Sequence, residues 1–310
     1  MGDIVKYHGR EICKDKNGKI VRAITRNQDK LLDAIEHNDV IFVSGPAGTG
    51  KSAVSAWYAI SQLDLGVYDR IILTRPIMEA GESLGFLPGT VEEKVAPFMA
   101  PLYELIEKIK GKKITEEFAH KINTQEPPQT RYRAKKGAKP QPKKKLQSNE
   151  DFYKKVEVCP LAYMRGTTMS KSFVVVDEIQ NLTEKNILLA LSRIGSGTKM
   201  CLCGDIMQSD LDGTGTRSGF ATMIKKLDGV PGITHVKFSV EDIVRSGVVK
   251  RILERLYGQH QYESEVYEHH PEDYDFSDDD ITEDQDSGYY SDDELVDEDN
   301  LNPTDNPNDK

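Results

Sequence analysis

One short stretch of the chain combines glycine, lysine and serine at a spacing suited to phosphate chemistry. It reads GPAGTGKS. Glycines let backbone N–H groups turn inward around phosphate oxygens, Lys51 can reach the β- and γ-phosphates, and the Ser52 hydroxyl can ligate Mg²⁺. An apolar run over 40–43 and a helical pattern over 53–60 flank the stretch, which favours a phosphate loop over a flexible glycine-rich turn. The predicted nucleoside triphosphate site, called the phosphate loop below, comprises Gly45, Pro46, Ala47, Gly48, Thr49, Gly50, Lys51 and Ser52.

Two acids follow a second apolar run, Val174–Val176. In a parallel sheet the carboxyl ends of the strands face the ligand crevice, so Asp177 and Glu178 are expected beside the phosphate loop. Asp177 would hold Mg²⁺ through water, and Glu178 would orient and deprotonate the attacking water. The alternative is a pair of acids that merely cap a strand. With the phosphate loop upstream, the pair predicts hydrolysis.

Three further polar residues are candidates for the same site. Gln208 closes the motif GDIMQ after another apolar strand, where it could contact the γ-phosphate or its attacking water. Gln180 could do the same, although each glutamine taken alone also fits a surface amide. Arg245 follows the last expected strand and could supply an arginine finger, with an exposed helical arginine as the alternative.

Gln28, which lies 17 residues before Gly45, is the candidate residue for recognition of the nucleotide base. Its amide could pair with N6 and N7 of adenine, which favours ATP over GTP. An Asn-Lys-x-Asp guanine signature is absent from the sequence, and the D-x-x-G at 210–213 carries little weight alone.

Hydrophobic periodicity predicts an α/β fold. We expect a mostly parallel sheet with helices on both faces, preceded by an N-terminal extension over 1–26 with a hairpin at Asn17-Gly18. The expected strands cover 40–43, 70–74, 156–158, 173–177, 199–204 and 235–238. The expected helices cover 27–38, 91–109 (divided by Pro97 and Pro101), 183–194 with apolar positions Ile187, Leu188, Leu191 and Ile194, 218–227 and 248–257.

Charge is distributed unevenly along the chain. Residues 261–310 contain 20 Asp and Glu and one Lys, so the net charge of −10 leaves +9 on residues 1–260. A basic body favours an anionic partner such as nucleic acid, although ordinary surface charge is an equal alternative. The segment 131–145 holds eight Lys and Arg and no acid, within a predicted disordered insertion over 111–152 where Tyr132 could stack on a base. A solvated linker is the alternative there.

The four cysteines have no spacing typical of a secreted disulfide framework, and no apolar run is long enough for a membrane span. Cys201 and Cys203 should face the same side of one strand, as buried thiols rather than metal ligands. We therefore expect a cytoplasmic protein without a membrane partner.

Taken together, these motifs resemble the PhoH family of phosphate-starvation-inducible ATPases, which are related to the first motor domain of superfamily 1 helicases. The resemblance covers about 25–258, except for the basic insertion, and two of its stretches are not general phosphate-loop features: EAGESLGFLPG over 79–89 and PLAYMRG over 160–166. The other stretches that carry it are 42–52, 72–76, 176–181 and 204–208.

The resemblance implies a RecA-like ATPase domain over 27–258, associated with RNA metabolism, in a bacterial or bacteriophage protein. It places Thr74 and Arg75 near a nucleic-acid track, which Arg165 would also line. The resemblance also implies assembly into rings, with a hexamer as one candidate. Arg245 could then act across a subunit boundary. We expect neither an N-terminal nuclease domain nor a second motor domain, so a monomer should not unwind nucleic acid. Residues 259–310 are expected to be a disordered acidic tail.

The leading hypothesis is an ATP- and Mg²⁺-dependent ATPase that acts on RNA or single-stranded nucleic acid, as a homo-oligomer. The alternative is an ATP-gated binding module in which slow hydrolysis only resets affinity for a partner. A small-molecule kinase is disfavoured, because it must exclude water and has less need of Glu178.

Overall fold

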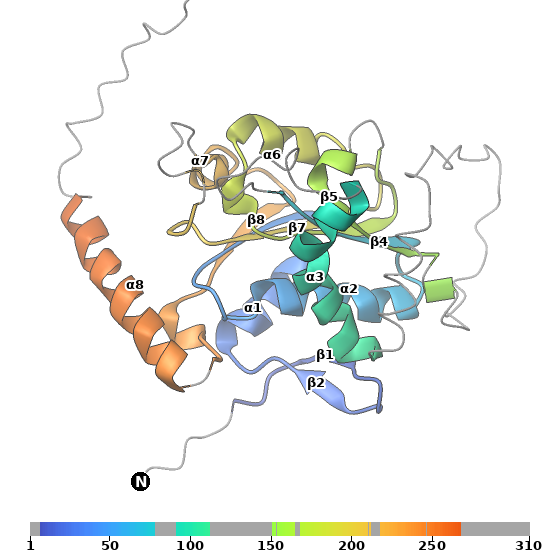
Figure 1. Cartoon of the computed structure of the whole chain (residues 1–310), viewed down its shortest axis with the longest axis horizontal. Helices are drawn as coiled ribbons and strands as arrows, with labels where there is room; N and C mark the ends of the chain where they lie inside the picture. The colour runs from blue at the N-terminus through green and yellow to red at the C-terminus, as the bar shows by residue number, and fades with distance from the viewer. Residues whose placement is uncertain are drawn as a thin grey trace, which may run out of the picture. The chain divides into compact units, whose positions relative to one another are not determined.

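The structure is built around a six-stranded sheet in which all pairings among the described residues are parallel (Figure 1). The strands lie in the order β5-β4-β6-β7-β3-β8, so the predicted parallel α/β fold is confirmed. Their bounds are β3 (Val40–Ser44), β4 (Arg70–Arg75), β5 (Val156–Pro160), β6 (Ser172–Val176), β7 (Lys199–Gly204) and β8 (Ile233–Lys237).

This computed structural model describes residues 7–77, 91–111, 151–152, 154–164, 168–209, 211, 218–245 and 247–267, with the backbone alone at 91–93 and 258–267. Four predictions fall outside these residues: the loop over 79–89, the basic insertion apart from its ends, the role of Arg165, and the acidic tail beyond residue 267.

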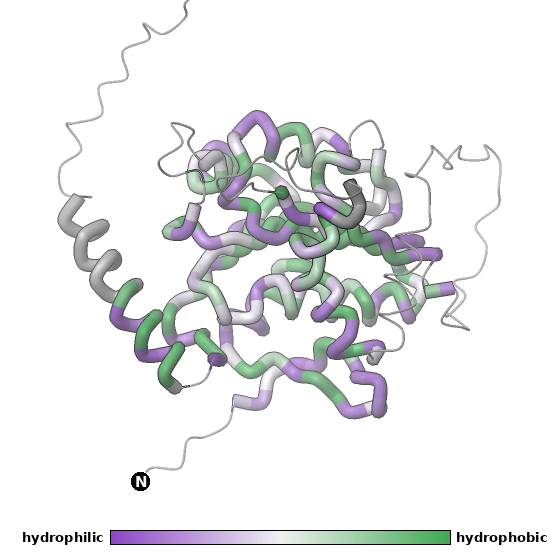
Figure 2. Tube along the Cα trace, in the orientation of Figure 1, coloured by the Kyte–Doolittle hydropathy of each residue, from purple (hydrophilic) through white to green (hydrophobic). Residues whose placement is uncertain are grey.

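Helices cover both faces of the sheet, because alternate residues of each buried strand point to opposite sides. On one face, Ile41 and Val43 of β3 pack in a core with helices α1 (Arg26–His37), α2 (Lys51–Asp64) and α3 (Val91–Lys110). On the other face, Phe42 packs with α6 (Glu184–Leu191) and α7 (Phe220–Lys226). The inner strands β3, β4, β6 and β7 are mostly hydrophobic along their length (Figure 2), as expected where a sheet is buried on both sides.

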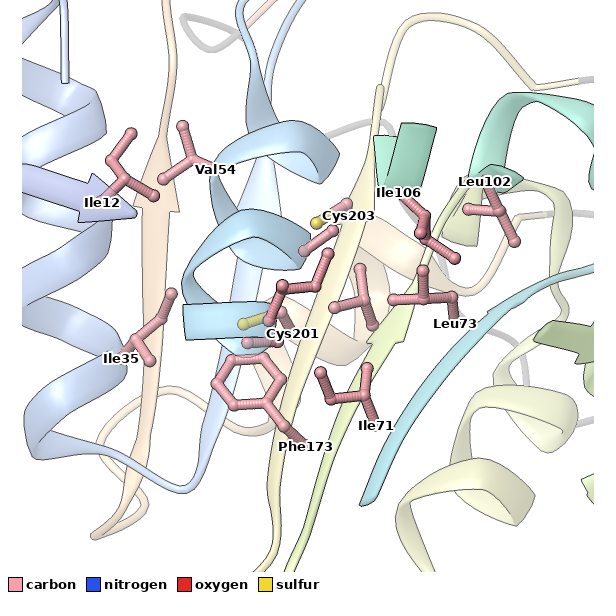
Figure 3. Packing of buried hydrophobic residues seen from close by; sticks show 14 of the residues in the cluster. Ile12, Ile35, Val54, Ile71, Leu73, Leu102, Ile106, Phe173, Cys201 and Cys203 are labelled. Atoms are coloured by element: carbon pink, nitrogen blue, oxygen red, sulfur yellow. The ribbon is translucent and has the colours of Figure 1, made fainter. Parts of the chain in front are cut away.

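The larger core lies between the sheet and α1–α3 (Figure 3). Phe173 of β6 is fully buried there and makes an edge-to-face contact with Tyr68, with ring centroids 5.4 Å apart. Cys201 and Cys203 of β7 both point into this core as free thiols, which confirms their predicted common direction. Burial raises the pKa of both thiols, and the Ser55 hydroxyl lies 3.6 Å from the Cys203 sulfur.

Two local sequence signals place the N-terminal elements. Asn17-Gly18 lies in the turn between strands β1 (Glu11–Lys14) and β2 (Ile20–Arg22), and Gly18 takes the positive φ of 77° that such a turn requires. Thr25 then caps α1, since its side chain accepts a hydrogen bond from the Gln28 N–H. The predicted hairpin and first helix are both confirmed.

Helix α3 is continuous, so the prediction that Pro97 and Pro101 divide it is wrong. A proline removes one helical hydrogen bond and crowds the preceding turn. The two prolines are four residues apart and both are exposed. The opposite face, with Met99, Leu102 and Ile106, is buried in the core and holds the helix together.

Two of the later predicted helices, those expected over 183–194 and 248–257, differ in detail from the structure. In α6, Ile187 is fully buried but Leu188 is 59% exposed, so the prediction that Leu188 lies on the buried face is wrong. The stripe i, i+3 runs instead through Ile187 and Ala190. The final helix, α8 (Gly247–Tyr267), continues beyond the expected end at 257 and past the predicted tail boundary. The first compact unit of the chain ends at Tyr262, and the second comprises 263–310.

Ile187 and Leu188 are a matched pair for testing this packing. We expect Ile187→Ala to lower the free energy of unfolding by about 2–5 kcal/mol, because it leaves a cavity under α6. Leu188→Ala should change the free energy by no more than about 0.5 kcal/mol, since its side chain is largely in water. Urea unfolding of both variants measures the difference. Equal losses would contradict the burial pattern.

Candidate active site

The phosphate loop connects the end of β3 to the start of α2. Gly45, Gly48 and Gly50 have positive φ angles of 140°, 81° and 91°, a region that residues with a side chain rarely adopt. At Gly45 a Cβ atom would also lie 2.5 Å from the carbonyl oxygen of Phe238, which follows β8. The glycines are therefore required by backbone shape, and successive N–H groups in such a turn form an anion-binding concavity.

Lys51 is the first residue of α2 and lies back over the phosphate loop. Its Nζ donates to the carbonyl oxygens of Gly45 (2.6 Å) and Pro46 (2.8 Å), and its side chain is buried. Burial lowers the pKa of Lys51, and the negative charges of three nearby carboxylates oppose that shift. Those carboxylates belong to Asp205, Asp177 and Glu178.

Asp177 and Ser52 meet at the strand end, as predicted. The Ser52 hydroxyl donates to Oδ1 of Asp177 at 2.5 Å, and the Asp177 N–H donates to the carbonyl of Thr74 (2.8 Å) on the neighbouring strand. Two oxygen ligands so close together fit a hard cation such as Mg²⁺, which is held in proteins by a few oxygens and several waters. The donor set would therefore hold Mg²⁺ through Ser52 and Asp177, where the ion supplies positive charge for phosphate oxygens.

Glu178 has a positive φ of 55°, an uncommon conformation for a residue with a side chain. Its two carboxylate oxygens have different partners. Oε2 accepts a 2.5 Å hydrogen bond from Gln180, and Oε1 lies 3.5 Å from the Arg75 guanidinium. The carboxylate is therefore held in place while its side chain stays 39% exposed, so water can reach it.

Gln180 is 3% exposed and joins two strand ends. Its Nε2 donates to Glu178, and its Oε1 accepts from the N–H of Asp205 (3.1 Å), directly after β7. The amide thus has both of its ends engaged by the protein. In the structure Gln180 supports Glu178, and its predicted contact with the γ-phosphate remains a prediction.

Asp205 and Tyr257 are two polar residues of the site to which sequence reasoning gave no role. The Tyr257 hydroxyl of α8 donates to Oδ2 of Asp205, and the N–H of Met207 donates to Oδ1 (3.1 Å). Both side chains are buried, 5% and 8% exposed respectively. Asp205 could have been singled out by its position at a strand end beside Lys51, whereas nothing in the sequence marks Tyr257.

Gln208 lies in the turn after β7, where its N–H donates to the carbonyl of Asp205 (3.2 Å) and its side chain is exposed. Gln28 is instead buried against the phosphate loop. Its Nε2 donates to the Thr49 carbonyl (3.0 Å), and its Oε1 accepts from the Ile24 N–H (2.9 Å). The structure explains Gln28 as a support for the loop, and its contact with adenine remains a prediction.

Arg245 lies beside the phosphate loop of its own chain. A Cβ atom at Gly48 would be 2.6 Å from Cγ of Arg245, and the preceding Val244 N–H donates to the Gly48 carbonyl (3.1 Å). The arginine side chain is exposed next to the loop, so an arginine finger could act within one chain. Its action across a subunit boundary stays a prediction.

The residues predicted to contact nucleic acid differ in their exposure to solvent. Thr74 is fully buried, and its Oγ1 has no hydrogen-bond partner. Arg75, next to it, is partly exposed and paired with Glu178. Any contact with nucleic acid at this strand end would therefore come from Arg75, while Arg165 lies outside the described residues.

The fold and the site together are those of the P-loop NTPase class of proteins. The features that show it are the parallel sheet, the glycine-rich loop between β3 and α2, the buried lysine, and the Ser–Asp oxygen pair at the carboxyl end of the strands. A family model described as PhoH-like protein matches residues 20–257. The chain therefore belongs to the PhoH family.

Curated proteins with similar sequences carry the same family name. The chain is 37% identical over 244 residues to the PhoH-like protein of Bacillus subtilis strain 168, covering 79% of this chain and 66% of the relative. It is 40% identical to the PhoH-like protein of a Synechocystis strain (78% and 64% covered) and 34% identical to the protein PhoH of Escherichia coli K12 (74% and 57% covered). The chain thus spans less than two thirds of the length of these relatives.

None of the helices in the described part of the chain combines the length and the apolar character needed to cross a bilayer.

Proposed function

We propose that this chain is a Mg²⁺-dependent ATPase whose turnover serves RNA or single-stranded nucleic acid. The observation that carries the proposal is the meeting of Lys51, the Ser52–Asp177 pair and Glu178 at one edge of the sheet. These groups supply the parts that phosphoryl transfer to water needs: positive charge on the phosphates, ligands for the metal, and a carboxylate for the nucleophile.

Each residue has a defined task in this reaction. The N–H groups of the phosphate loop and Lys51 neutralise the charge of the triphosphate, and Ser52 and Asp177 hold Mg²⁺. Glu178 accepts a proton from the attacking water, which Gln208 contacts. The exposed guanidinium of Arg245 next to Gly48 stabilises the charge that develops on the γ-phosphate.

ATP is the proposed nucleotide because the sequence has no Asn-Lys-x-Asp signature for guanine. Gln28 lies against the phosphate loop, and its amide is the group that we assign to adenine. Hydrolysis is favoured over transfer to a small molecule because Glu178 is accessible to water.

RNA or single-stranded nucleic acid is the proposed partner for two reasons. The net charge of +9 on residues 1–260 suits a polyanion. In addition, the ion pair between Arg75 and Glu178 links the residue assigned to nucleic acid with the residue assigned to water activation. A phosphate that attracted Arg75 would free Glu178 for catalysis. Assembly into an oligomer would supply a second motor surface from another copy of the chain.

Glu178→Gln tests the proposed reaction. The amide cannot accept the proton, so we expect kcat for ATP to fall by about 10²–10⁴-fold while ATP still binds. Glu184→Gln is the matched control, because Glu184 is a partly exposed residue of α6 paired with Lys226, and its kcat should stay within twofold. Phosphate release with Mg²⁺ and binding of a fluorescent ATP analogue measure the two effects.

Tight ATP binding by the wild type with negligible turnover would contradict the ATPase proposal and favour an ATP-gated binding module. Normal turnover by Glu178→Gln would instead show that another group activates the water.

Arg75→Ala tests the coupling to nucleic acid. Wild-type turnover should rise severalfold with single-stranded RNA, and the rise should weaken with added salt because phosphate contacts release counterions. Arg75→Ala should remove most of the stimulation, whereas Arg22→Ala in the β1–β2 hairpin should keep it. The test measures ATP turnover as RNA is titrated at two salt concentrations. The native mass of the protein gives its oligomeric state in the same samples. Full stimulation of Arg75→Ala would refute the coupling.

A further inference from the structure

The segment after β8 contacts the phosphate loop at several points. The carbonyl of Phe238 approaches Gly45 so closely that no side chain would fit there. Further along, the N–H of Val244 donates to the Gly48 carbonyl, and the Arg245 side chain covers Gly48. The capping box of the short helix η4 (Val240–Asp242) fixes this segment, and Asp242 also accepts a 2.7 Å hydrogen bond from Asn27 of α1.

Helix α8 adds a buried contact from the same segment. The Tyr257 hydroxyl donates to the Asp205 carboxylate and faces the backbone N–H of Ala47 in the phosphate loop. Burial raises the pKa of Tyr257, and the hydrogen bond to Asp205 raises it further, so the hydroxyl keeps its proton and stays a donor. Tyr257 therefore joins α8 to two parts of the site at once.

The contact continues inward from Asp205. The N–H of Asp205 donates to Gln180, and Gln180 donates to the carboxylate of Glu178. Of the carboxylates that act on Lys51, Asp205 has the largest effect on its pKa. A hydroxyl that fixes the Asp205 carboxylate thus bears on both Lys51 and Glu178 without touching either.

We propose that Tyr257 is a positioning residue that couples α8 to the phosphate loop and, through Asp205 and Gln180, to Glu178. This inference rests on the proposed ATPase function. The N–H of Ala47 belongs to the turn that would cradle phosphate oxygens, so a bound phosphate would lie close to the Tyr257 hydroxyl. Binding of a nucleotide would therefore act on the surroundings of Tyr257, and α8 would respond to it.

Helix α8 carries exposed apolar side chains that this coupling would affect. Val248, Ile252 and Leu256 recur every four residues and are 60%, 53% and 52% exposed. They lie on the same helix as Tyr257. A change in the hydrogen bonds of Tyr257 would therefore reach them through α8. Nucleotide at the phosphate loop would thereby alter the mobility of α8.

Tyr257→Phe tests the inference, because it deletes the hydroxyl and keeps the ring. We expect kcat for ATP to fall about tenfold with KM within twofold, since Glu178 is less well held in the transition state. Tyr58→Phe is the matched control: Tyr58 is a partly buried tyrosine of α2 that packs against Phe173, and kcat should stay within twofold. Urea midpoints check that both variants fold.

Two further measurements separate positioning from a merely structural role. In a double-mutant cycle with Asp205→Asn, the two kcat losses should be strongly non-additive. In hydrogen exchange, the amides over 45–52 and 205–209 should exchange faster in Tyr257→Phe than in the wild type, and nucleotide should change the exchange of 247–257 in the wild type alone.

Each outcome has a defined meaning. Unchanged kcat in Tyr257→Phe, or additive losses in the cycle, would overturn the inference. If the wild type hydrolyses no ATP, the proposed function fails, and hydrogen exchange alone then decides the inference. Unchanged exchange over 45–52 and 205–209 in Tyr257→Phe would in that case overturn it as well.

Discussion

The parallel register of four adjacent strands is the constraint on which the rest of the site depends. Ser44 of β3 pairs with Gly204 of β7, and Thr74 of β4 pairs with Val176 of β6. Because β6 and β7 are themselves paired in parallel, the residues that follow all four strands emerge at the same edge. Side chains far apart in the sequence are thereby brought within hydrogen-bond reach.

That edge concentrates opposite charges around one buried ammonium group. Lys51 has lost most of its contact with water, which costs free energy unless partners replace the solvent. Two loop carbonyls and the charges of three carboxylates replace it. A second set of hydrogen bonds, through Gln180 and Tyr257, fixes two of those carboxylates. The site is thus a connected polar network at the edge of the apolar sheet core, and its members should not act independently.

Much of this architecture could be predicted from the sequence, because it follows from local patterns. The phosphate loop, its flanking strand and helix, and the acids after β6 each carry a signal within about ten residues. The strand order and the pairs Arg75–Glu178 and Tyr257–Asp205 could not be predicted, since they depend on which distant segments pack together. The errors at α3 and at Leu188 have a similar cause: burial on one helix face outweighs a local rule about proline or apolar spacing.

The central claim is that this polar network turns over ATP, and the most direct measurement is phosphate release by the wild type and by Lys51→Ala. With Mg²⁺ present, the wild type should release phosphate and a metal chelator should stop it. Lys51→Ala should be slower by at least about a hundredfold, since it removes the charge that we propose faces the phosphates. Lys30→Ala, on the exposed side of α1, should match the wild type. A Lys51→Ala variant that hydrolyses ATP at the wild-type rate would contradict the account.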